Sequence, residues 1–166
     1  APKELGPTEL YATSIQHNSN GRFISIMGDG EFVIYTAQSM RNKSFGTALD
    51  FVWSSLGSGD YAIRETPSKC VIFKNFKELK SFRPSVAAEE LFGGHLLGVR
   101  DSESVVFYDW ATAAIVRRVD ECPLGVYWSD SGELVSIATE DSFFVLRYHE
   151  EVVTAASAAA SGGGGG

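Results

Sequence analysis

The chain lacks the patterns on which several functional classes depend. It has only two cysteines and three histidines, and neither type shows the C-x-x-C or H-x-x-x-H spacing of a metal site. No apolar run approaches the ~18 residues of a membrane span, and no Gly-x-Ser-x-Gly nucleophile elbow is present. We therefore expect no metal, no cofactor and no bilayer anchor.

Helix signals and targeting signals are also scarce. Only residues 86–92 and the alanines of the tail are candidates for a helix, and both are too short to be stable alone. The start, Ala1 to Glu4, has neither an initiating Met nor the composition of a signal peptide, so we expect an excerpt of a longer protein. Cys70 lies in an apolar segment, which favours a small buried thiol over a disulfide with Cys122 and indicates a reducing compartment.

Paired carboxylates do not indicate an active site here. The adjacent acids are Glu89-Glu90, Asp120-Glu121, Glu140-Asp141 and Glu150-Glu151. Neighbouring residues on a strand point to opposite faces, so such a pair would not sit across one glycosidic bond. A propeller hydrolase, with acids from several blades around a central channel, is the enzymatic alternative. We expect no catalytic residue and no enzyme activity.

What the chain does contain is a repeat. A block of four residues, the first three of them apolar, begins at Phe32, Cys70, Val105 and Phe143. These starts are 38, 35 and 38 residues apart. Each copy also has two earlier apolar segments separated by turns, and the first three copies have a weaker fourth segment near residues 43–47, 78–82 and 114–119. Repeats of ~40 residues made of short strands are typical of propeller blades.

The predicted fold is therefore all-β. It is a partial WD-repeat β-propeller of about three and a half four-stranded antiparallel blades, with about fifteen strands. The blades are expected at about residues 10–49, 50–89, 90–124 and 125–153, followed by an Ala/Ser/Gly tail or linker at 154–166. Unpaired blade faces at both ends predict that this stretch alone aggregates or needs its missing blades.

A set of turn and core residues recurs at matching places in the copies. Trp53 and Trp128 are two periods apart, and Asp109-Trp110 resembles the strand-ending step of WD repeats. Acids in turns usually accept hydrogen bonds that stabilise the turn, and Asp-Gly favours a two-residue hairpin turn. The predicted structural residues are Asp29, Gly30, Trp53, Asp101, Asp109, Trp110, Trp128 and Asp141.

Charge is divided unevenly along the chain. Residues 1–83 hold 10 basic and 8 acidic side chains, whereas residues 84–166 hold 4 basic and 13 acidic. The net charge of −7 disfavours nucleic acid as a ligand, and the acidic half suits either a basic peptide or simple solubility. The single basic cluster, interleaved with phenylalanines, indicates either a solvated edge strand or a surface for an acidic partner or anionic lipid. Its members are Lys69, Lys74, Lys77, Lys80 and Arg83.

Several longer motifs resemble one family. They are Ile15–Phe23, Met40–Gly46, Tyr61–Glu65, Ile72–Glu78, Leu97–Arg100, Phe107–Trp110 and Trp128–Val135, and together they cover about residues 9–153. In order and spacing they are similar to the coatomer beta-prime subunit family, whose members carry two propellers before a helical solenoid. The resemblance places this stretch in the second propeller. The tail after Val153 departs from the family pattern.

The resemblance implies a structural subunit of the COPI vesicle coat, active in Golgi-to-ER retrograde and intra-Golgi transport. It implies other coatomer subunits as partners, and an Arf-type small GTPase and dilysine cargo tails as partners of the parent assembly. The implied location is the cytoplasm, peripherally on Golgi membranes and COPI-coated vesicles. The alternative is a WD-repeat scaffold of another complex, such as a ligase adaptor or a pore component.

Overall fold

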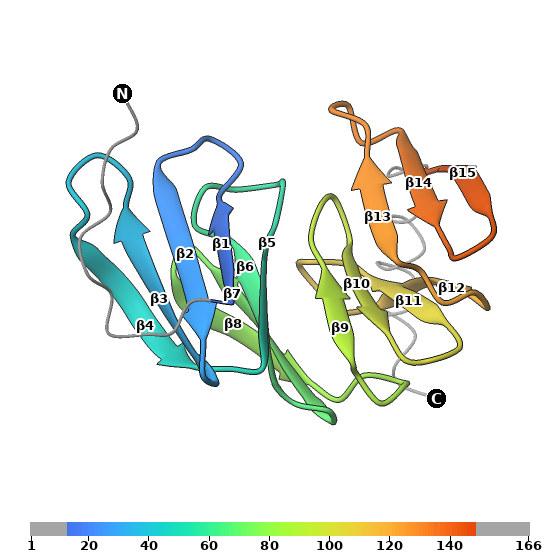
Figure 1. Cartoon of the computed structure of the whole chain (residues 1–166), viewed down its shortest axis with the longest axis horizontal. Coiled ribbons are helices and arrows are strands. Elements are labelled where there is room, and N and C mark those ends of the chain that lie inside the picture. Colours follow the sequence, from blue (N-terminus) through green and yellow to red (C-terminus); the bar gives the residue numbers. More distant parts are fainter. Residues whose placement is uncertain (1–12, 149–166) are drawn as a thin grey trace, which may run out of the picture.

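The computed structural model describes residues 13–148, which form fifteen strands in four antiparallel sheets (Figure 1). The first sheet contains β1 (Ser14–His17), β2 (Phe23–Gly28), β3 (Glu31–Thr36) and β4 (Asn42–Thr47). The second contains β5 (Asp50–Trp53), β6 (Tyr61–Thr66), β7 (Lys69–Lys74) and β8 (Lys77–Phe82). The third contains β9 (Glu90–Phe92), β10 (Leu97–Arg100), β11 (Val105–Tyr108) and β12 (Ile115–Val119). The fourth contains β13 (Gly125–Trp128), β14 (Leu134–Ala138) and β15 (Phe143–Arg147).

Each sheet is a meander in sequence order, because short turns return the chain beside the strand it has just left. Asp29 and Gly30 make the tightest of these turns, between β2 and β3. Their φ angles of 52° and 76° are both positive, as a two-residue primed turn requires. Glycine adopts this conformation without steric cost, which explains why Gly30 occupies the second place.

The four sheets follow one another in sequence order (Figure 1), and the first strands of the first three sheets are in contact. β1 contacts β5, and β5 contacts β9. Just beyond β5, Ser54 forms a parallel bridge with Gly94 of the third sheet. The first strands of these three sheets, β1, β5 and β9, are therefore the inner strands, and β4, β8 and β12 are the outer strands, which is the arrangement of propeller blades.

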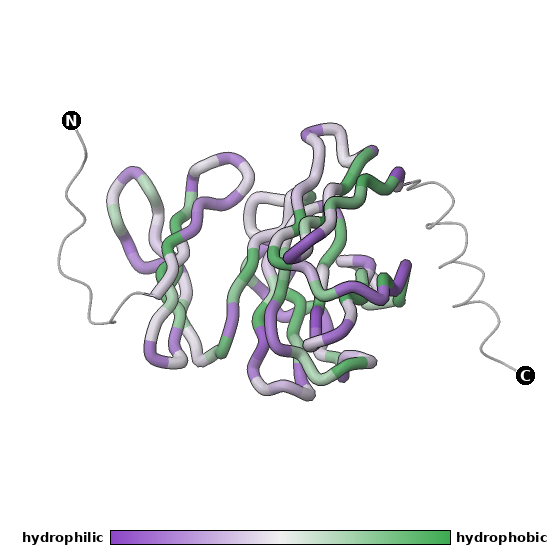
Figure 2. The backbone as a smooth tube through the Cα atoms, turned by 45° about the vertical axis from the view of Figure 1, so that its right-hand side comes forward, coloured by the Kyte–Doolittle hydropathy of each residue, from purple (hydrophilic) through white to green (hydrophobic). Residues whose placement is uncertain are grey.

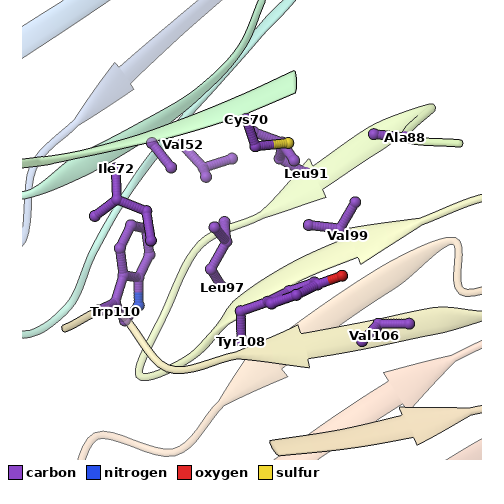
Figure 3. Close-up of a cluster of buried hydrophobic side chains, with 11 residues drawn as sticks. Val52, Cys70, Ile72, Ala88, Leu91, Leu97, Val99, Val106, Tyr108 and Trp110 are labelled. Carbon is purple, nitrogen blue, oxygen red and sulfur yellow. The ribbon is translucent and has the colours of Figure 1, made fainter. Parts of the chain in front are cut away.

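Three apolar clusters fill the spaces between neighbouring sheets. Between the second and third sheets, Val52, Cys70 and Ile72 face Leu97 and Val99 (Figure 3). Hydrophobic residues follow the strands, whereas the turns are mostly hydrophilic (Figure 2). Because both faces of an inner sheet are covered, the middle strands are apolar at consecutive positions, which produced the repeated block seen in the sequence.

The prediction of an all-β partial propeller is confirmed. Residues 86–92 form no helix: β9 starts at Glu90, and the residues before it lie against the second sheet, where the Ala88 amide donates to the Pro67 carbonyl at 2.8 Å. The first strand of the third sheet ends at Phe92, and just beyond it the Gly94 carbonyl accepts the Ser55 amide that follows β5.

The expected tail at 154–166 lies outside the described residues. None of residues 13–148 lies in a helix long and apolar enough to cross a bilayer.

Candidate functional site

The basic cluster lies along the outer edge of the second sheet. All five basic side chains are exposed, and the phenylalanines between them pack inward against the sheet clusters. The five do not form one patch, however. Lys74 and Lys77 face each other across the β7–β8 turn, while Lys69 and Arg83 lie at the opposite end of the two strands.

Neighbouring groups divide the cluster further. Lys80 donates to the Thr112 carbonyl of the third sheet at 2.9 Å, and Lys69 pairs with Glu65 at 2.9 Å. Lys43 of the first sheet adds a cation at the turn, where its Nζ lies 5.0 Å from the centre of the Phe76 ring. Lys43, Lys74 and Lys77 thus gather three cations at the β7–β8 turn, where the Asp60 carboxylate accepts the Asn75 amide at 3.0 Å.

A second candidate is the face of the fourth sheet that points away from the third. Tyr127 and Val145 both lie opposite Ser136, and Phe143 is two residues before Val145, so these three side chains share one face. They are 62%, 54% and 65% exposed, respectively. In the part of the chain that the structure describes, β15 is an edge strand with no partner on its outer side. An apolar face beside an open edge is the surface that a further blade would cover.

Hydrogen bonds along the inner strands join the sheets to one another. The Gln16 amide donates to the Phe51 carbonyl at 2.8 Å, and the Asn18 amide donates to the Ser58 carbonyl at 2.7 Å. Asp50 accepts the Leu91 amide of the third sheet at 2.8 Å. Burial raises the pKa of Asp50, against the opposing effects of the Leu91 and Phe51 amides and of Arg64. These links set the angle between sheets, since each is a directional bond between two of them.

Gly94 is the point where three sheets meet. Its carbonyl accepts the Ser55 amide from the second sheet at 3.0 Å and the Trp110 indole from the third at 2.9 Å. Its φ of +125° is a conformation that side chains rarely adopt, and the space a Cβ would occupy is filled by the indole of Trp128 from the fourth sheet. The sequence shows only a Gly-Gly pair here, so the role of Gly94 follows from tertiary contacts alone.

Trp53 and Trp128 occupy the same place in their sheets, each at the end of a first strand, but they differ in polar contacts. The Trp53 indole donates to the Ser25 hydroxyl of the preceding sheet at 3.0 Å. The Trp128 Nε1 is buried with no hydrogen-bond partner. The register explains the difference: Ser25 lies opposite Ile34, and the matching residue of the third sheet, opposite Phe107, is Gly98, which has no acceptor side chain.

The predicted turn acids act in different ways. Asp101 accepts the amides of Glu103 and Ser104 at 2.8 and 2.7 Å, and these bonds, led by that of Glu103, lower its pKa. Asp109 accepts the Thr112 amide and hydroxyl at 3.0 and 2.8 Å. Asp141 accepts hydroxyls from Thr139 and Ser142 at 3.4 and 3.1 Å, whereas Asp29 contributes its positive φ to the turn. Each therefore has a local structural explanation.

Both cysteines are free thiols. Cys70 is fully buried between the second and third sheets, and burial raises the pKa of its thiol to about 12. Among residues 13–148, no three His, Cys, Asp or Glu side chains gather in a way that would hold a metal ion. The arrangement is thus one of packed blades with exposed edges and turns, and the basic edge is a candidate surface for recognition, whereas a further blade would cover the open face of the fourth sheet.

Comparison with known proteins decides which propeller this is. The family model of the COPA/B second beta-propeller matches residues 1–162. The chain belongs to this family. Coatomer subunit beta' of Rattus norvegicus and that of Homo sapiens are each 55% identical over 148 residues, 89% of this chain. Coatomer subunit beta'-1 of Arabidopsis thaliana is 51% identical over 150 residues, 90% of this chain.

The chain spans 16% of the length of these COPA/B relatives. More distant propellers of known structure share the fold alone. The Cps50 (Swd1) beta-propeller domain of Myceliophteria thermophila has a TM-score of 0.62 at 13% identity, over 82% of this chain and 52% of that one. A chain of the mitotic checkpoint complex has a TM-score of 0.64 at 12% identity, over 84% and 49%. Half of a solved propeller chain is therefore matched, which agrees with a partial propeller here.

Proposed function

We propose that this chain is part of the second propeller of a coatomer beta-prime subunit and that it acts as a structural element of the COPI coat. The observation that carries the proposal is the 55% identity to coatomer subunit beta' across 148 residues, together with the family match over residues 1–162. The parent protein would serve Golgi-to-ER retrograde and intra-Golgi transport in the cytoplasm and peripherally on Golgi membranes. It has no catalytic role.

The geometry supports a scaffolding role. The acids of the turns hold backbone amides or hydroxyls of their own turns, and Asp50 holds two sheets together. Partners would therefore bind at the edges and faces of the disc-shaped propeller, which propellers commonly use for binding. The partners are other coatomer subunits, with an Arf-type GTPase and dilysine cargo tails reached through the whole assembly. In this proposal the blades span residues 10–49, 50–89, 90–124 and 125–153.

The test is purification of the tagged full-length protein from cytosol, followed by mass spectrometry of what accompanies it. Recovery of the other coatomer subunits in near-equal amounts is the expected result. Recovery of ubiquitin-ligase or nuclear-pore components without coatomer would refute the coat assignment, and the alternative of a WD-repeat scaffold in another complex would replace it.

The basic edge is proposed as a partner-binding surface, because its lysines carry positive charge in a chain that is acidic as a whole. The Lys74→Glu, Lys77→Glu variant of the full-length protein should lose part of its partners in the same purification. The matched control is Arg117→Glu, Arg118→Glu on the exposed outer strand β12, which changes the charge equally. Equal recovery from both variants would show that the edge is only solvated.

A further inference from the structure

The turn between β6 and β7 has a sequence that the coat function does not explain. β6 ends at Thr66 and β7 begins at Lys69, and these two residues pair, so Pro67 and Ser68 form the turn itself. All four residues are exposed. The Thr66 hydroxyl therefore lies at an exposed end of the second sheet, away from the packed clusters.

The order of residue types at this turn matches a substrate of proline-directed protein kinases. These kinases phosphorylate a serine or threonine directly before proline, and many of them favour a basic residue three positions after the acceptor, which is a charge pattern of the kind that kinases use for selection. Thr66, Pro67 and Lys69 meet all three conditions. The other four prolines follow alanine, glycine, arginine and cysteine, so Thr66 is the only such acceptor in the 166 residues.

Few contacts hold the Thr66 side chain. Its Oγ1 accepts the Ser68 amide at 3.2 Å and shares a hydrogen bond of 3.4 Å with the Ser68 hydroxyl. Both bonds are long and exposed, and the register of the two strands is irregular between Arg64 and Thr66. Releasing the Thr66 hydroxyl from these two bonds would therefore cost little, because water replaces them.

Cations and donors lie close to the place where a phosphate would sit. Lys69 is next to Thr66 across the turn and now pairs with Glu65 at 2.9 Å. Arg83, Ser68 and Ser85 line a depression beside Pro67. A phosphate of charge about −2 would compete with Glu65 for Lys69 and draw Arg83 towards the turn, since each can donate a charge-assisted hydrogen bond.

This depression is also where the second sheet meets the segment that leads to the third. The Ala88 amide donates to the Pro67 carbonyl at 2.8 Å, and Ser85 bonds through its amide to the Tyr108 hydroxyl at 2.8 Å. Charge added at Thr66 would thus act on residues 83–88, which connect the two blades.

We propose that Thr66 is a phosphorylation site for a proline-directed kinase, and that Lys69 and Arg83 hold the phosphate against the segment joining the second and third blades. In the transfer, the bond between the β,γ-bridging oxygen and the γ-phosphorus of ATP breaks, and a bond from Thr66 Oγ1 to that phosphorus forms. ADP leaves, and the hydroxyl proton passes to solvent.

The first experiment treats the full-length protein with Mg-ATP and a purified proline-directed kinase, and maps the product by mass spectrometry. Phosphate on Thr66 is expected. Thr66→Ala should remove it and Pro67→Ala should slow its appearance at least about tenfold, whereas the matched control Ser68→Ala should be labelled like the wild type. A peptide of residues 61–73 serves as the unfolded reference. The proposal is overturned if the peptide is labelled and the folded protein is not, or if neither is.

The second experiment tests the role of the two cations. The second pKa of the phosphate, about 6 in a free phosphopeptide, should be lower in the folded protein when followed by phosphorus NMR. Arg83→Ala and Lys69→Ala should each move it back towards the peptide value, and Arg118→Ala should not. An identical titration in folded protein and peptide would show that neither side chain holds the group.

Discussion

Gly94 carries no side chain, yet residues of three sheets depend on it. Its carbonyl accepts hydrogen bonds from the Ser55 amide and the Trp110 indole, and its missing Cβ leaves space for the Trp128 indole. Gly94→Ala would place a methyl group 2.5 Å from the Trp128 Nε1 at a φ of +125°. We expect a loss of at least about 3 kcal/mol in the free energy of unfolding, because backbone strain and overpacking add.

The control for this change is Gly21→Ala, where φ is +71° but nothing lies within 4 Å of the new methyl group. This change should lower the free energy of unfolding by about 1–2 kcal/mol, which is the strain of a left-handed residue with a side chain and nothing more. Native-state hydrogen exchange of the two variants in the full-length protein, followed at the strand amides of the second and third sheets, measures the difference. Equal losses would mean that the junction of sheets at Gly94 contributes nothing beyond its backbone angle.

The two thiols should differ in reactivity. Cys70 is fully buried and its pKa is raised to about 12 by burial, so almost none of it is thiolate at neutral pH, whereas Cys122 is partly exposed. Alkylation of the native protein with iodoacetamide at pH 7.5 should modify Cys122 at least about tenfold faster than Cys70. Labelling in denaturant is the control, and equal rates in native protein would contradict the burial of Cys70.

At the scale of elements, the hairpin turn between β10 and β11 should respond to pH. The pKa of Asp101 is lowered by the hydrogen bonds from Glu103 and Ser104, so the folded state favours the charged carboxylate. Its stabilising effect is complete above the ordinary Asp pKa of about 3.9 and is lost as pH falls through the lower folded value.

Hydrogen exchange at the Glu103 and Ser104 amides measures this effect. After correction for intrinsic rates, protection should fall below about pH 4 in the wild type, and in Asp101→Asn it should be lower and nearly independent of pH. Asp130→Asn, which removes an exposed acid of another turn, should behave like the wild type. The same pH dependence in Asp101→Asn would assign the effect to another group.

The strands could be predicted from the sequence because each carries its own signal. The blocks beginning at Phe32 and Cys70 are consecutive apolar residues, which only a middle strand covered on both faces needs, and Asp29-Gly30 has the chemistry of a tight turn. Contacts between sheets carry no such local signal. The bond from Asp50 to Leu91 and the crossing at Gly94 join residues about 40 positions apart, and nothing in either segment indicates its partner.

The candidate helix at residues 86–92 is too short to be stable alone, and the structure has none there. The Ala88 and Leu91 amides instead donate to the Pro67 carbonyl and the Asp50 carboxylate of the second sheet, and no local signal in the sequence indicates these bonds. Likewise, the basic cluster could be found in the sequence, but its separation into two ends of a hairpin depends on the register of β7 and β8.

For the whole molecule, the open face of the fourth sheet decides whether the 166-residue chain is stable and monomeric without further blades. Tyr127, Phe143 and Val145 expose more than half of their surface on one side, next to the edge of β15, which has no partner strand among residues 13–148. Purified by itself, the 166-residue chain should aggregate, and it should bind a hydrophobic dye such as ANS more strongly, per mole, than the full-length protein does.

Static light scattering and dye fluorescence at equal molar concentrations measure this. Phe143→Lys with Val145→Thr in the isolated chain should reduce association, because a charged edge and a less apolar face discourage pairing. A monomeric isolated chain with a single cooperative melt would contradict the expectation and show that the four sheets form a self-sufficient body.

The distribution of bonds between sheets also has a mechanical consequence. Directional links concentrate at the inner strands, through Gln16, Asn18, Asp50 and Gly94, whereas the outer strands are joined by exposed contacts such as that of Lys80 with Thr112. A lateral load should therefore separate neighbouring blades first at the periphery and leave the inner strands as the hinge. Neighbouring blades should therefore tilt relative to each other about their inner strands more easily than they slide past one another.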